Sequence, residues 1–168
     1  MKKVYLFLIT TAVVLTATLA GCSKKDDAGS SVPDPEGTMT ANISQSSQIN
    51  IGGGYIAWAP PDNFDLVGYG TTYNGSLGVS ICDLGEMRGL GNITSIPQAG
   101  YIDGGGSVFN TAAACEVGHG YVIKAEYRGS SYSVTYVRLY VQESIVSTSG
   151  GVMGAKVKYQ YPFTDSGN

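Results

Sequence analysis

The last fifty residues constrain the fold most strongly, because two long segments there alternate apolar and polar side chains. In residues 132–146 the aliphatic side chains of Val137, Leu139 and Val141 share one face. The opposite face carries larger polar or aromatic side chains, namely Tyr136, Arg138, Tyr140 and Gln142. Residues 152–161 repeat the pattern, and Gly150-Gly151 supplies a turn between the two segments. A period of two residues is that of a half-buried strand. We therefore expect a long antiparallel pairing here.

Shorter segments of the same kind recur toward the N-terminus, separated by Gly, Pro and Asn clusters. The expected strands cover residues 38–43, 48–51, 55–59, 64–67, 77–82 and 121–128, with a hairpin loop at 129–131. A short helical turn around Thr111–Ala114 is the one exception. The chain has 24 glycines, 12 tyrosines and only 14% charged residues, which is typical of extracellular β proteins. The predicted fold is all-β: one antiparallel β-sandwich, Ig-like or a partly open barrel, over residues 37–163, followed by a tail at 164–168.

The first 21 residues have the features of a cleaved export signal. Lys2 and Lys3 precede an apolar run that ends in Leu19-Ala20-Gly21-Cys22. The run is short and closes on small residues, as in a signal peptide rather than a membrane-spanning helix. The ending looks like a bacterial lipoprotein box, in which the Cys22 thiol takes a diacylglycerol and becomes the mature N-terminus. Two or more acyl chains hold such a protein on a membrane.

Residues 22–36 are expected to form the lipidated cysteine and a flexible tether, because they are rich in Lys, Asp, Ser and Gly and contain two prolines. Within them, Ser23-Lys24-Lys25-Asp26-Asp27 resembles the signal that sends Bacteroidetes lipoproteins to the outer face of the outer membrane. A solvated charged linker is the alternative interpretation. The predicted location is the outer membrane, exposed at the cell surface.

Charge and residue counts argue against several functional classes. The formal charge is −3, or about −5 once Lys2 and Lys3 leave with the signal, and no basic patch exists, so nucleic acid is not an expected partner. His119 is the single histidine and follows Cys115 by four residues. A Cys–His nucleophile pair is formally open, but a plain Gly-His-Gly turn is favoured.

With one histidine and few thiols, we predict neither a metal site nor a cofactor. Aspartates in apparent turns, such as Asp83, are expected to bond nearby backbone.

Two cysteines, Cys82 and Cys115, remain after lipidation of Cys22. Export places them in an oxidising compartment, where a disulfide between them is a candidate. The alternative is two separate buried thiols that act as small apolar side chains.

Aromatic residues in or beside glycine-rich loops are the candidate ligand contacts: Tyr55, Trp58, Tyr69, Tyr73 and Tyr101. Exposed flat rings stack on sugars or pack at protein interfaces. The alternative is core and cross-strand packing, for which tyrosine is favoured in sheets.

With these residues in view, the chain resembles a family of uncharacterised Bacteroides-type surface lipoproteins. The resemblance rests on motifs spread across the domain, at residues 34–38 (Asp-Pro-Glu-Gly-Thr), 89–97, 118–122, 136–141, 147–160 (ending Val-Lys-Tyr-Gln) and 162–163. Tyr101 stands where the family pattern has Trp, and the cysteine pair is particular to this chain. The resemblance implies location and domain extent, and it transfers no site.

The sequence predicts an outer-membrane-anchored lipoprotein whose domain is a non-catalytic extracellular binding module for a glycan or an envelope protein. One alternative is a structural or accessory envelope lipoprotein that packs through an apolar patch around Tyr136 and Tyr140. A carboxylate-dependent hydrolase is a further alternative, and it would need two carboxylates converging in a cleft.

Overall fold

The computed structural model describes residues 32–44, 46–51, 54–59, 65–69, 76–103, 110–128 and 131–165. Within them lie strands and a short 3₁₀ helix, η1 (Leu90–Asn92). The strands are β1 (Met39–Ser44), β2 (Ile49–Ile51), β3 (Gly54–Ala59), β4 (Asp65–Tyr69), β5 (Ser76–Glu86), β6 (Ile102–Asp103), β7 (Asn110–Ala114), β8 (His119–Arg128), β9 (Tyr132–Val146) and β10 (Val152–Gln160).

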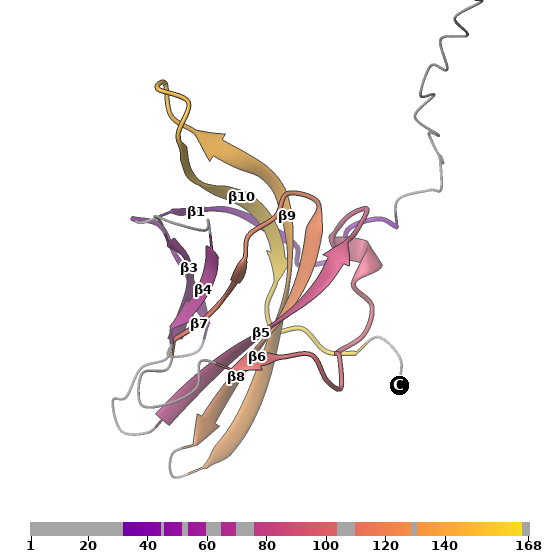
Figure 1. Ribbon diagram of the computed structural model, residues 1–168. Helices are drawn as coiled ribbons and strands as arrows, with labels where there is room; N and C mark the ends of the chain where they lie inside the picture. The colour runs from indigo at the N-terminus through magenta and orange to yellow at the C-terminus, as the bar shows by residue number, and fades with distance from the viewer. Residues whose placement is uncertain are drawn as a thin grey trace, which may run out of the picture.

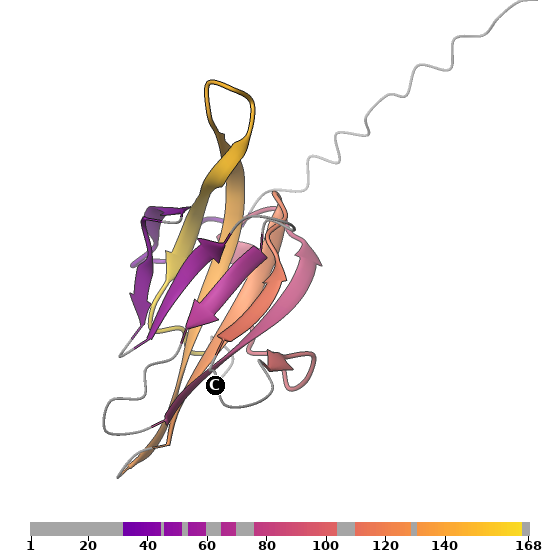
Figure 2. The same ribbon diagram turned by 60° about the vertical axis from the view of Figure 1, so that its left-hand side comes forward.

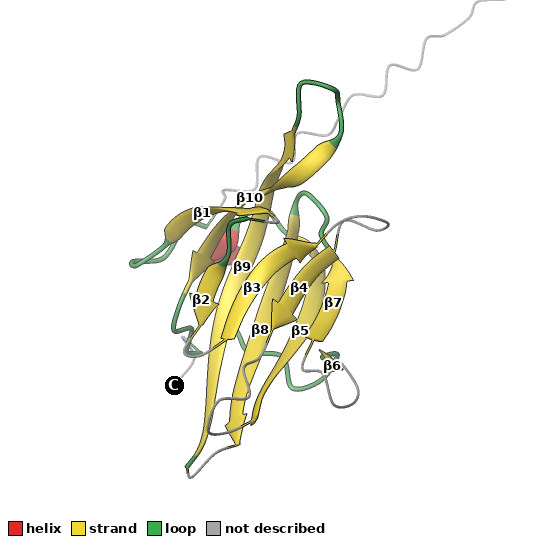
Figure 3. Cartoon of the chain, turned by 90° about the vertical axis from the view of Figure 1, so that its left-hand side faces the viewer, coloured by secondary structure: helices red, strands yellow, loops and turns green. Residues whose placement is uncertain are grey.

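The strands form two antiparallel sheets that do not close into a barrel (Figures 1 and 3). The six-stranded sheet has the order β1-β10-β9-β8-β5-β6, and the four-stranded sheet has the order β2-β3-β4-β7. The all-β, sandwich-type expectation is therefore confirmed. None of the helices in the described residues is both long enough and apolar enough to cross a membrane.

The main core lies between the two sheets. The six-stranded sheet turns a row of aliphatic residues toward the four-stranded sheet, including Val137, Leu139 and Val141 of β9. Ile56 and Leu66 come from the opposite sheet and are completely buried. The alternation predicted for 132–146 is thus the alternation of the structure, and β9 pairs with β10 as expected.

A second, smaller core covers the outer face of the six-stranded sheet, which is the face turned away from the four-stranded sheet. Leu90 and Ile93, in and after η1, pack with Phe163 over Val122 of β8. Tyr136 and Tyr140 join this cluster as partly buried residues. The chain thus folds back over both faces of its larger sheet.

Thr111–Ala114 belongs to strand β7 and is not a helical turn, so that expectation was wrong. β7 pairs with β4, and the register places Ala113 opposite Leu66. Ala113 is buried in the main core while Ala112 and Ala114 are exposed. A run of three alanines carries no visible alternation, so the strand conformation here is set by hydrogen-bonded pairing with the edge of β4.

The hairpin of β9 and β10 extends beyond the rest of the sandwich (Figures 1 and 2). β8 pairs with β9 as far as Gly120 and Tyr140, and β1 pairs with β10 as far as Ser44 and Gly154. We call residues 142–153 the projecting arm. Its strands carry two register irregularities, one between Val152 and Gly154 and one between Lys156 and Val157.

Residues 32–36, which the sequence assigned to the tether, contact the folded domain. Asp34 forms an ion pair with Lys158, and the Glu36 carbonyl accepts a hydrogen bond from Gln160 at 2.8 Å. A Cβ atom on Gly91 would lie 2.3 Å from the Pro33 carbonyl oxygen. The N-terminal segment therefore runs directly over η1, and this close approach requires glycine at position 91.

Candidate functional site

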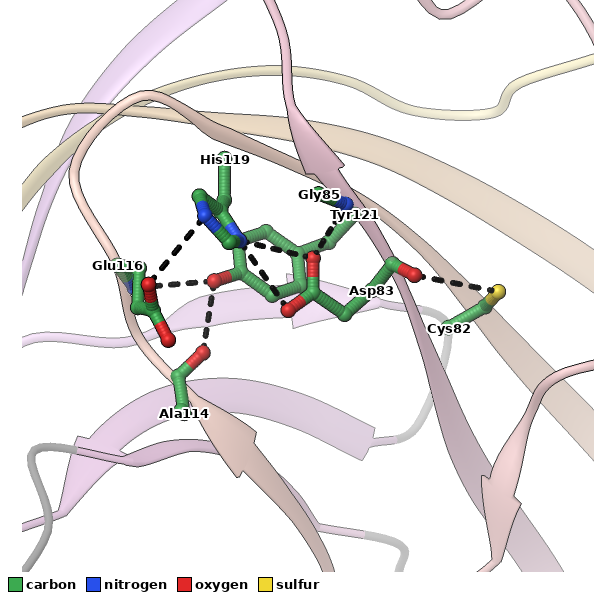
Figure 4. A network of polar contacts seen from close by, with 7 residues as sticks. All are labelled: Cys82, Asp83, Gly85, Ala114, Glu116, His119 and Tyr121. Atoms are coloured by element: carbon green, nitrogen blue, oxygen red, sulfur yellow. Dashed lines mark hydrogen bonds and ion pairs between the residues drawn. The ribbon is translucent and has the colours of Figure 1, made fainter.

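His119 is held between two carboxylates (Figure 4), where β5 ends and β8 begins. His119 Nδ1 lies 3.1 Å from Asp83 Oδ1, and His119 Nε2 lies 3.3 Å from Glu116 Oε2. The exposed fractions of the His119, Asp83 and Glu116 side chains are 17%, 31% and 58%. We call these three residues the rim cluster.

Three different chain segments bring the rim cluster together. Asp83 lies near the end of β5, His119 begins β8, and Glu116 lies in the turn between β7 and β8. The register of β5 and β8 shifts between Asp83 and Glu86, and Gly85 has a φ of 74° at this irregularity. The Gly85 N–H donates to Asp83 Oδ1 at 2.8 Å. This agrees with the expectation that Asp83 bonds nearby backbone, and it also orients the carboxylate toward His119.

Tyr121 fixes the turn between β7 and β8 to the main core through hydrogen bonds. Its ring is completely buried in the main core, and its hydroxyl donates to the Ala114 carbonyl at 2.7 Å. The same hydroxyl oxygen accepts the Glu116 N–H at 3.0 Å (Figure 4). Burial raises the pKa of Tyr121 above its ordinary value, so the hydroxyl remains a donor. The turn that carries Glu116 is thereby fixed to the core.

Both ring nitrogens of His119 are partnered by carboxylates, so neither faces a reacting group in this arrangement. Burial raises the pKa of the Cys115 thiol to about 12, with Asp65 as a further cause. A nucleophilic cysteine needs the opposite shift. The geometry therefore suits a structural histidine–carboxylate cluster at the surface better than a Cys–His nucleophile. The described residues contain no group of three or more His, Cys, Asp or Glu side chains arranged to hold a metal ion.

Both cysteines that the structure describes are free thiols, so the candidate disulfide between Cys82 and Cys115 is not present. Cys115 packs against the main core between the sheets. Cys82 lies opposite Val122 in the register of β5 and β8, and Val122 belongs to the outer core. The Cys82 sulfur lies 3.7 Å from the Ala99 carbonyl oxygen. The six-stranded sheet therefore separates the two thiols. Burial, with Asp83 as a second cause, raises the pKa of Cys82 as well.

The candidate aromatic contacts do not gather on one described surface. Tyr101 packs into the outer core, and burial raises its pKa. Its buried hydroxyl has no hydrogen-bond partner among the residues that the structure describes. Tyr55 is half-buried on β3, in the other sheet, in register with Tyr69 of β4. The side chains of Trp58 and Tyr69, and all of Tyr73, lie outside the described residues, as does Cys22.

The face that carries Tyr136 and Tyr140 is covered by the protein itself. Arg138, between them on β9, is only 5% exposed. Its Nε donates to Gln160 at 2.7 Å, its Nη1 donates to the Ile93 carbonyl, and its guanidinium lies over the Phe163 ring. Burial lowers the pKa of Arg138. The expected apolar docking patch on this face is therefore an internal packing surface.

The sequence analysis considered His119 and Asp83 separately and did not identify Glu116 or the rim cluster. Glu116 and His119 are three residues apart, and that spacing is visible in the chain. Asp83 is 36 residues from His119, and β6 and β7 lie between their strands. Only the pairing of β5 with β8 brings this carboxylate to the ring.

The fold and the rim cluster define an antiparallel β-sandwich with a histidine–carboxylate cluster where β5 ends and β8 begins. No family model matches the chain, and neither a curated protein nor a solved structure shows significant similarity to it.

Proposed function

We propose that the protein is a non-catalytic module, anchored at the cell surface by lipid, that binds another protein of the cell envelope. The projecting arm is the observation that carries this proposal. It extends beyond the rest of the sandwich and presents exposed aliphatic and thioether side chains, with Val146 at 55% and Met153 at 53% exposure. Among the described residues, β8 and β1 flank β9 and β10 only as far as Tyr140 and Gly154. Two strands without neighbours are marginally stable in water, so a partner bound to the arm would add stability there.

The location is proposed from the N-terminus of the chain. The Leu-Ala-Gly-Cys ending and the lysine–aspartate run that follows it support a lipidated Cys22 and an outer-membrane position. The proposed membership of the Bacteroides-type surface lipoproteins rests on the motifs quoted above. Replacing Cys22 with serine should abolish incorporation of radioactive palmitate and release the chain from the membrane fraction. Recovery of an uncleaved chain from the cytosol would contradict this location.

A protein partner is favoured over a glycan by the placement of the aromatic residues. A sugar platform needs several rings on one accessible surface, whereas Tyr101 packs against the outer core and Tyr55 lies on β3 of the four-stranded sheet, and both are partly buried. The accessory-lipoprotein alternative loses its motivation, because the chain itself covers the face around Tyr136 and Tyr140. The hydrolase alternative gains no support from Asp83 and Glu116, since each already bonds His119.

Site-specific photo-crosslinking of the full chain in living cells tests this function. A photoreactive residue replaces Val146 in the arm, and a matched variant carries it at Ser133, an exposed position near the other end of β9. We expect the Val146 position to give a discrete adduct with one envelope protein and the Ser133 position to give none. Equal labelling from both positions, or no protein adduct from Val146, would overturn the proposal.

A further inference from the structure

The edge of the projecting arm formed by β9 is open. The last paired residue of β8 on this side is Gly120, opposite Tyr140, and the Gly118 N–H adds one bond to the Val141 carbonyl at 2.9 Å. Beyond that point β9 continues to Val146, and its register partners among the described residues are all in β10. The backbone groups on the free side of residues 143–146 are thus available to an added strand.

The opposite edge of the arm, formed by β10, has fewer free backbone groups. β1 covers β10 as far as Gly154, where a Cβ atom would lie 2.2 Å from the Ile43 carbonyl oxygen. Only Val152 and Met153 extend further, and a register irregularity falls at this point. Bulges and short edges are devices that prevent strand addition. On β9 the register with β10 is continuous from Glu143 to Val146, and the extra residue of the second irregularity, Gln142, lies directly before this segment. Residues 142–153 contain no lysine, arginine or proline.

The surroundings of this edge are acidic. Residues 83–88, 115–119 and 142–156 carry four carboxylates and two permanently cationic side chains: Asp83, Glu86, Glu116 and Glu143 against Arg88 and Lys156. Lys156 already pairs with Glu143 at 2.9 Å. Glu116 is the most exposed carboxylate of the rim cluster and lies in the turn directly before Gly118. A strand added beside β9 would end next to this turn, so positive side chains on it would be attracted.

We propose that the β9 edge from Glu143 to Val146 accepts an extended, lysine- or arginine-rich segment of the partner protein as an additional strand. Main-chain hydrogen bonds to β9 supply the affinity, and Glu116, the most exposed carboxylate of the rim cluster, favours a basic segment. The inference rests on the proposed binding function and adds the chemistry of the partner.

Hydrogen exchange of the full chain in detergent micelles tests the inference. The probes are a capped heptapeptide that alternates lysine with valine and threonine, and its counterpart with glutamate in place of lysine. The lysine peptide should slow exchange at residues 143–146 by about tenfold or more, and the glutamate peptide should leave it unchanged. Two N-methylated forms of the lysine peptide separate backbone pairing from charge attraction. Methylation of the amides on one edge should abolish the protection, and methylation on the other edge should preserve it.

A charge variant and its matched control complete the test. Glu116→Gln combined with Glu143→Gln should weaken binding of the lysine peptide several-fold, while Glu36→Gln, an exposed carboxylate outside the arm and rim, should not. Equal protection by both methylated peptides, protection elsewhere in the chain, or no protection at all would overturn strand addition. If the peptides fail while the Val146 crosslink persists, the binding function stands and this partner chemistry is wrong. Loss of the crosslink as well would overturn both.

Discussion

The guanidinium of Arg138 lies 4.6 Å from the centre of the Phe163 ring, at the middle of the outer core. The contact joins the long strand β9 to the C-terminal segment, whose Phe163 N–H also donates to the Tyr136 carbonyl at 2.8 Å. Because Arg138 bonds Gln160, and Gln160 bonds the Glu36 carbonyl, both ends of the folded chain meet at this one buried cation. Arg138 thus holds together the segments that cover the outer face of the six-stranded sheet.

Arg138→Ala should lower the free energy of unfolding by about 2–4 kcal/mol, because it leaves the Ile93 carbonyl and Gln160 without their donor. Arg138→Lys should recover only part of this loss, since one ammonium cannot replace the planar guanidinium. Urea denaturation measures both values. Lys156→Ala is the matched control: its ion pair with Glu143 is solvent-exposed, and about 0.5 kcal/mol or less is expected. An Arg138→Ala variant as stable as the control would contradict the role given to Arg138.

Gly91→Ala should displace the N-terminal segment from η1, since the added methyl would overlap the Pro33 carbonyl oxygen. We expect a loss of about 1–3 kcal/mol and faster hydrogen exchange at residues 34–38. Gly89→Ala is the control, because no atom of the described residues lies within 4 Å of a Cβ atom at that position. If exchange in the segment is the same in both variants, the segment is not held by this contact.

Tyr121→Phe removes one hydroxyl that serves two backbone groups, the Ala114 carbonyl and the Glu116 N–H. The expected cost is about 1–3 kcal/mol, because both groups lose a partner next to the core. Tyr132→Phe also removes a hydroxyl bond, to Glu126, but at an exposed position, so a few tenths of a kcal/mol are expected. Thermal unfolding of the two variants checks the difference, and equal midpoints would refute the support ascribed to Tyr121.

Cys115 makes stability fall at alkaline pH. The thiol ionises near its ordinary pKa of 9.0 in the unfolded chain and near 12 in the folded one. Between these values the unfolded chain loses a proton that the folded chain retains, so stability declines as pH rises from about 9 toward 12. Cys115→Ala should flatten this decline in urea titrations at pH 8, 9 and 10. An unchanged slope would show that the thiol is not buried as a neutral group.

The same residue allows a direct test of the cysteine pairing. Denaturation without a reductant, followed by iodoacetamide and mass spectrometry, should alkylate both Cys82 and Cys115, because the six-stranded sheet separates them. In the native state Cys115 should react far more slowly than in the denatured chain. Recovery of a peptide linked through both cysteines would contradict the structure.

The sheet-forming elements were predictable wherever side chains alternate clearly. Val137, Leu139 and Val141 lie in the core as the pattern indicates, and the β9–β10 pairing follows from two long amphipathic strands around Gly150-Gly151. The alanine-rich β7 carries no such pattern, and the pairing of its edge with β4 decided its conformation. Local periodicity identifies a strand, whereas the choice of neighbour is made by contacts distant in sequence.

The candidate sites were harder to predict for the same reason. The rim cluster depends on the pairing of β5 with β8, which no local pattern indicates. Compartment and number alone left a disulfide between the cysteines open. In the structure, strand parity turns Cys82 toward the outer face of the six-stranded sheet, whereas Cys115, just after β7, packs against the core between the sheets. Tyr101 was singled out for its glycine-rich surroundings, and it is a covering residue of the outer core.

The docking of Val32 and Pro33 over Gly91 has a mechanical consequence. Tension that reaches the fold along its N-terminal side is applied first to the contacts over η1 and to the ion pair of Asp34 with Lys158, before it reaches the edge strand β1. A strand pulled from a sheet edge unzips one hydrogen bond at a time, whereas a segment clamped across the face loads several contacts together. Glycine at position 91 allows the N-terminal segment to pack over η1, and the packed segment therefore shields the edge strand β1 from tension.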